Sequence, residues 1–131
     1  MMPIGTLAKQ SGVHIETIRY YERVGVLPKA LRAANGRRIY GQQDVRRLAF
    51  IRHARDLGFE LASVRALLAL QETPELSCKS ASDLASAQLL AVESRLSRLN
   101  VLRDELKRMV RGCKNGRVID CRVIEALSTM I

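Results

Sequence analysis

The amino-acid sequence predicts a mainly α-helical protein, with a small N-terminal domain that contains a β-hairpin and one long C-terminal helix. Three observations support this fold class. The chain is rich in Ala and Leu and has few runs of β-branched residues, a composition that favours helix. Residues 80–111 contain neither Pro nor Gly, so a single helix can run through them. Asn35-Gly36 is a dipeptide typical of tight hairpins.

Length and charge narrow the class of protein. A chain of 131 residues suits one core with an appendage rather than two large domains. The net charge is +9, and residues 1–74 hold 12 basic and 6 acidic side chains, which is +6 of that total. This concentration indicates a polyanionic partner, although a generically soluble basic protein remains the alternative.

Apolar runs are too short to span a bilayer, and the N-terminus lacks the pattern of a signal peptide. We therefore expect a cytoplasmic protein with no membrane partner. In that compartment thiols stay reduced and can bind metal.

The N-terminal segment predicts two short helices joined by a turn. The first covers residues 4–10, and Gly12 suits the left-handed conformation that ends a helix. The second runs from about Ile15 to Val24, with Ile18 and Tyr21 facing the core. Two helices separated by such a turn are typical of a helix-turn-helix.

The next segment predicts a β-wing and two more helices. Asn35-Gly36 precedes a basic strand, Arg37–Tyr40, and the two together form the wing. A third helix then extends from Gln42 to about Leu57, and a fourth from about Leu61 to Leu70. Pro74 cannot continue the fourth helix, so a linker follows it.

The long helix is predicted over Ser80–Arg111, at about 45 Å too long to be buried in so small a monomer. Its apolar residues step by three and four, with Arg103 at one seam position. The seam consists of Leu89, Val92, Leu96, Leu99, Leu106 and Val110. A partner helix in a homodimer would cover it, and packing back onto its own domain is the alternative. We expect three segments: 1–74, 75–112 and 113–131.

Several motifs in combination resemble the MerR family of bacterial transcription regulators: Ile4-Gly5, Leu7-Ala8, Thr17–Glu22, Gly25–Pro28, Asn35–Tyr40 and Phe50-Ile51. The resemblance spans essentially the whole chain. It implies a winged helix-turn-helix DNA-binding domain, a long antiparallel coiled-coil dimerisation helix, and a C-terminal metal-binding loop and helix.

Residue chemistry supports DNA contact by the second helix and the wing. The planar guanidinium of Arg19 suits phosphate or guanine, and Tyr20 offers a hydroxyl for phosphate. Tyr21 is expected to pack inward instead. The resemblance implies double-stranded DNA contacts at six positions: Thr17, Arg19, Tyr20, Arg37, Arg38 and Tyr40.

Three cysteines, Cys78, Cys113 and Cys121, are candidate metal ligands. Their odd number argues against a disulfide framework. Cys78 and Cys113 lie at opposite ends of the predicted helix, so they cannot share an ion within one chain. In an antiparallel dimer, Cys78 of one chain would lie beside Cys113 and Cys121 of the other, as the family resemblance also implies. Structural cysteines that bind no metal remain the alternative.

Thiolate ligands favour soft cations, namely Hg(II), Pb(II), Cd(II) or Zn(II), with Asp120 or water as a further donor. Cu(I) bound by Cys113 and Cys121 is the rival, although copper-responsive relatives typically lack a thiol at the position of Cys78. From the resemblance, metal would make the dimer distort promoter DNA so that RNA polymerase starts on resistance or efflux genes. No enzyme is expected, since the sequence has no Cys-x-x-Cys and no His close to a Cys.

Overall fold

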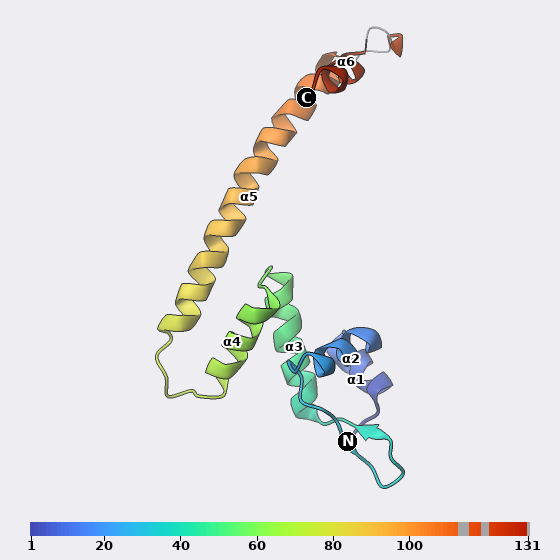
Figure 1. Ribbon diagram of the computed structural model, residues 1–131, viewed down its shortest axis with the longest axis vertical. Coiled ribbons are helices and arrows are strands. Elements are labelled where there is room, and N and C mark those ends of the chain that lie inside the picture. The colour runs from blue at the N-terminus through green and yellow to red at the C-terminus, as the bar shows by residue number, and fades with distance from the viewer. Residues whose placement is uncertain (113–115, 119–120, 131) are drawn as a thin grey trace. The chain divides into compact units, whose positions relative to one another are not determined.

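The computed structural model describes residues 1–112, 116–118 and 121–130 (Figure 1). Two compact units make up the chain, Met1–Leu84 and Ala85–Ile131. The first contains four helices and a two-stranded sheet, and the second contains most of the long helix together with a short terminal helix. The predicted boundary at residue 74 stays a prediction.

Helices α1 (Ile4–Ser11) and α2 (Ile15–Arg23) form the expected helix-turn-helix. Gly12 adopts φ 72°, and its N–H donates to the carbonyl of Ala8 at 2.9 Å, which ends α1. A side chain at Gly12 would also collide with the guanidinium of Arg52. Glycine is therefore required at this turn for its backbone conformation, whereas the exposed Arg52 guanidinium ends a flexible side chain that can move aside.

The wing is a hairpin of two short strands, β1 (Leu31–Arg32) and β2 (Arg38–Ile39), with Leu31 opposite Ile39. Gly36 at its turn has φ 82°, as the Asn-Gly dipeptide predicts. The strand is shorter at both ends than predicted, because Arg37 lies between the turn and β2, and Tyr40 pairs elsewhere. Tyr40 forms a bridge with Met2, through reciprocal backbone hydrogen bonds of 2.7 and 2.8 Å.

Helices α3 (Gln42–Asp56) and α4 (Leu61–Gln71) complete the core of the first unit. Figure 1 shows α1 and α2 beside α3, and α3 also contacts α4. The most deeply buried apolar side chains come from all four helices and the segment after α2: Leu7, Ile18, Val26, Leu27, Leu48, Ile51, Val64 and Leu68. Tyr21 is buried as predicted, and Tyr20 is exposed.

The second unit confirms the long helix. Helix α5 (Lys79–Gly112) spans 34 residues, and α6 (Arg122–Thr129) lies near the C-terminal end of the described residues. All six seam side chains are exposed, from 38% at Val92 to 68% at Val110. The apolar seam is therefore uncovered within one chain. Among the described residues, no helix is both long and apolar enough to cross a membrane.

Candidate functional site

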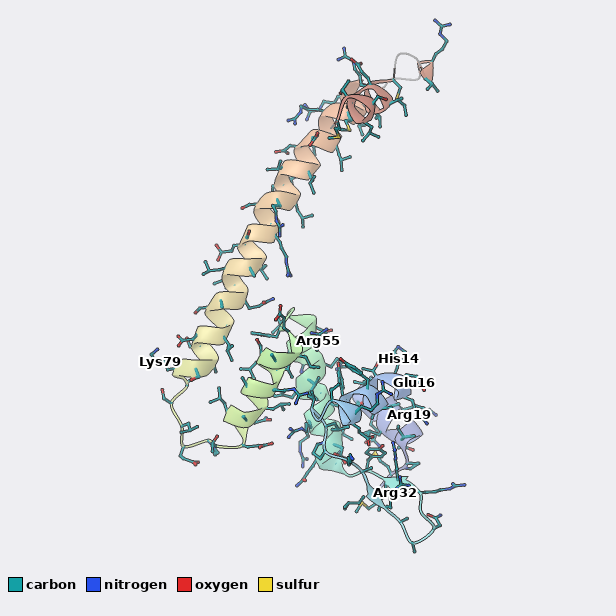
Figure 2. The ribbon with its side chains drawn as sticks, in the orientation of Figure 1. His14, Glu16, Arg19, Arg32, Arg55 and Lys79 are labelled. Atoms are coloured by element: carbon teal, nitrogen blue, oxygen red, sulfur yellow. The ribbon has the colours of Figure 1, made fainter. Side chains whose placement is uncertain are left out.

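A basic cleft lies between helix α2 and the wing, with a volume of about 780 Å³. Its lining residues are Ile4, Arg19, Glu22, Arg23, Lys29, Ala30, Arg32 and Arg38. Five of these eight side chains are cationic, and Figure 2 shows Arg19 and Arg32 on the same part of the domain. Such a surface suits a phosphodiester backbone, which binds through Lys and Arg side chains.

On α2, the predicted DNA contacts occupy exposed or half-buried positions. Arg19 is 49% exposed and pairs with Glu16 at 3.0 Å. An exposed pair of this kind is worth little, so a phosphate can compete for the guanidinium. Tyr20 is 43% exposed, with the Arg23 guanidinium 5.8 Å from its ring centre, and Thr17 is half-buried.

The wing presents Arg37 and Arg38 to solvent. Arg37 follows the turn, where its N–H donates to the Asn35 side-chain oxygen at 3.0 Å. Arg38 lines the cleft and lies opposite Arg32 in the hairpin. The wing therefore supplies cationic side chains both at its tip and along the cleft.

Tyr40 requires a correction, because the structure places it in the core and not on the expected DNA surface. Only 1% of the side chain is exposed, and its hydroxyl donates to Oε1 of Glu22 at 2.5 Å. Burial, followed by the neighbouring Glu22 carboxylate, raises the pKa of Tyr40 to about 12. A ring enclosed in this way cannot reach a phosphate without opening the domain.

Three cleft residues were not expected from the sequence: Arg23, Lys29 and Arg32. For two of them, the sequence holds a pattern that predicts their position. Arg23 lies four residues after Arg19, which places both on one face of α2. Arg32 is found by pairing the hairpin back from Asn35-Gly36 to Arg38. Lys29 lies in an irregular segment with no such periodicity.

The two cysteines that the structure describes stand next to helix N-termini. Exposed Cys78 immediately precedes α5, and its carbonyl accepts the Ser82 N–H at 3.0 Å. Half-buried Cys121 immediately precedes α6, and its carbonyl accepts the Glu125 N–H at 3.0 Å. Cys113 and Asp120, the other proposed donors, lie outside the described residues. Within the part of the chain that is described, no three His, Cys, Asp or Glu side chains gather around a metal-sized space.

A helix-turn-helix, a basic wing and a long exposed helix together are typical of a DNA-binding protein, the class to which transcription regulators belong. The family model described as "MerR HTH family regulatory protein" matches residues 2–71, and one described as "MerR, DNA binding" matches residues 45–109. The chain therefore belongs to the MerR family.

Its relatives include metal-responsive regulators. The HTH-type transcriptional regulator ZntR of Escherichia coli (strain K12) is 38% identical over 130 residues, covering 97% of this chain and 92% of the relative. The mercuric resistance operon regulatory protein of Bacillus cereus is 35% identical over 125 residues, covering 95% of each. Among solved structures, the transcription regulator PbrR691 from Ralstonia metallidurans CH34, in complex with lead(II), is 33% identical with a TM-score of 0.82. That match covers 97% of this chain and 99% of the other. The chain is similar to these regulators over nearly its whole length.

Proposed function

We propose that the chain, as a homodimer, binds double-stranded promoter DNA and activates metal-resistance or efflux genes when a soft divalent metal binds. The basic cleft between α2 and the wing is the observation that carries this proposal. Thr17, Arg19 and Tyr20 contact the DNA from α2, and Arg37 and Arg38 contact it from the wing. Lys29 and Arg32, which line the cleft, add phosphate contacts.

The metal site would form only between two chains. Helix α5 separates Cys78 from Cys113 and Cys121, and 34 residues extend for about 50 Å. An antiparallel pair of α5 helices would bring Cys78 of one chain towards Cys113 and Cys121 of the other. The adjoining N-terminus of α6 favours negative charge, and so supports a metal-bound thiolate at Cys121.

Three thiolates suit a soft divalent ion: Hg(II), Pb(II), Cd(II), or Zn(II) with Asp120 or water as a fourth donor. The lead(II) complex of the similar regulator supports this class of ion. Cu(I) held by Cys113 and Cys121 alone is the alternative. Binding at the dimer junction would favour one arrangement of the two subunits. The regulator would then shift the energy of promoter deformation, on which RNA polymerase depends.

Mixed dimers test the cross-chain site. Neither Cys78→Ser nor Cys121→Ser homodimers retain a complete set of three thiols. A dimer of one chain of each kind retains one complete site out of two. Because equal mixing makes about half of the dimers mixed, we expect about a quarter of the wild-type metal content after refolding together.

Metal content is read by titration with Pb(II) or Hg(II), with separately refolded homodimers as controls. If mixing restores no metal binding, a site shared between subunits is excluded. If Cys78→Ser alone leaves binding intact and Cu(I) binds at wild-type strength, the copper alternative replaces the divalent one.

A further inference from the structure

A buried carboxylate, Glu22, lies in the wall of the basic cleft. Its side chain is only 7% exposed, although it belongs to the helix that would face DNA. Oε1 accepts the Tyr40 hydroxyl at 2.5 Å, and Oε2 lies 3.7 Å from Nη1 of Arg38. A carboxylate is costly to bury unless such partners compensate for the lost water. The Tyr40 hydroxyl therefore holds Glu22 directly, and Arg38 of the wing forms an ion pair with it.

Tyr40, which donates this hydrogen bond to Glu22, is itself held rigidly. Its backbone is paired with Met2 in both directions, and its ring is enclosed by the core. The hydroxyl therefore has a fixed position, from which it holds the Glu22 carboxylate.

Arg38 can bind a second anion while it remains beside Glu22. Its side chain is 46% exposed, and it lines the cleft. A guanidinium carries five N–H donors in a planar fork. Its Nη1 lies 3.7 Å from Glu22, which is ion-pair but not hydrogen-bond distance, so donors remain for a phosphate.

We propose that Glu22 is a positioning residue for DNA recognition: together with Tyr40 it holds α2 against the wing and orients the Arg38 side chain towards a phosphate. The contacts among Tyr40, Glu22 and Arg38 are called the brace below. This inference rests on the DNA binding proposed above. For a substitution at Glu22, it predicts the opposite change in DNA affinity from the one that charge alone predicts. Without the brace, removing a negative charge from the cleft would tighten binding to every DNA sequence. With the brace, removing Glu22 or the Tyr40 hydroxyl weakens specific binding.

The test compares two duplexes: one selected by the wild-type dimer from a random pool, and a scrambled duplex of the same composition. Glu22→Gln and Tyr40→Phe should each raise the Kd for the selected duplex by roughly three- to thirtyfold. The Kd for the scrambled duplex should stay within about twofold, or fall slightly for Glu22→Gln, because a sequence-independent complex has no fixed register in which the oriented Arg38 meets one phosphate. Glu60→Gln makes the same chemical change on an exposed carboxylate of the same unit, and should alter neither value.

Salt dependence separates positioning from a merely structural role. Loss of one phosphate contact per chain should reduce the salt slope of the dimer by about 1.8, at about 0.9 per phosphate. If Glu22 acts through Arg38, adding Arg38→Ala to Glu22→Gln should cost no more than either change alone. A destabilised but uncoupled domain would show a lower melting temperature, an unchanged slope and additive losses, which would overturn the proposal.

If Glu22→Gln fails to fold, the same comparison of single and double variants can be made with Tyr40→Phe and Arg38→Ala. In one outcome, the wild type selects a duplex while Glu22→Gln and Tyr40→Phe keep its ratio of Kd values for the scrambled and selected duplexes. That result would refute the brace but not the proposed DNA binding. A wild type that selects no duplex would refute the proposed DNA binding, and the brace with it.

Discussion

Replacing Leu99 with alanine should weaken the dimer without harming the fold of either unit. Leu99 lies on the predicted seam of α5 and is 60% exposed in the single chain. It borders an apolar groove of about 720 Å³ that also includes Leu102, Leu106 and Val110. Because this surface is uncovered in one chain, its burial must come from a partner.

The size of the effect follows from the exposed fraction. Burying a leucine side chain completely is worth about 1.5–3 kcal/mol, so the exposed 60% corresponds to about 1–2 kcal/mol per chain. Each dimer contains two copies, and alanine retains part of the contact. We therefore expect a loss of about 2–3 kcal/mol per dimer, which raises the dimer dissociation constant by roughly 30- to 150-fold.

Sedimentation equilibrium over a range of concentrations measures this constant, and Val101→Ala is the matched control. Val101 is 64% exposed and lies two residues further along α5, which is about 200° around the helix. The control should dimerise like the wild type. Equal weakening in both variants, or no weakening in Leu99→Ala, would contradict the assignment of the seam.

Two further predictions concern the first unit. Arg47 donates from Nε to the Val26 carbonyl at 2.9 Å and from Nη1 to Glu72 at 2.8 Å; Arg47→Met should therefore lower the free energy of unfolding by about 2 kcal/mol in urea titrations. Arg46→Met, at the exposed neighbouring position, should change it by less than about 0.5 kcal/mol. The raised pKa of Tyr40 favours the folded state below pH 10, and this contribution, about 2–3 kcal/mol, should disappear as pH rises from about 10 to about 12. Over that range Tyr40→Phe should lose less stability than the wild type; parallel losses would show that Tyr40 is not the responsible group.

The elements set by local chemistry could be predicted from the sequence. Gly12 and Asn35-Gly36 specify their turns through backbone conformations that few other residues adopt, and both turns form where predicted. The long helix begins and ends within one residue of the predicted range, because nothing in residues 80–111 interrupts it. The burial of Ile18 and Tyr21 follows from helical spacing alone.

Tyr40 shows where sequence reasoning failed. Its spacing from the hairpin turn gives no sign that Met2 pairs with it, since that contact joins residues 38 positions apart. The bridge at Met2 and the bond to Glu22 hold the ring inward, and neither is visible in a local pattern. The basic cleft is a similar case, because Lys29 reaches it from an irregular segment.

The proposed DNA-binding surface can form within one chain, whereas the proposed metal site needs two chains. The C-terminal end of α2 is held by side chains of α3 and α4: Arg47 bonds the Val26 carbonyl, and Arg65 bonds the Val24 carbonyl. Together with the Glu22–Tyr40 connection, these bonds preform the DNA-binding surface within a single chain. The three thiols cannot meet in that way, because α5 lies between them. Leu99→Ala, diluted until its dimers dissociate, should therefore keep a folded first unit and weak sequence-independent DNA binding, yet lose metal binding. Metal bound at full strength by such monomers would place the site within one chain.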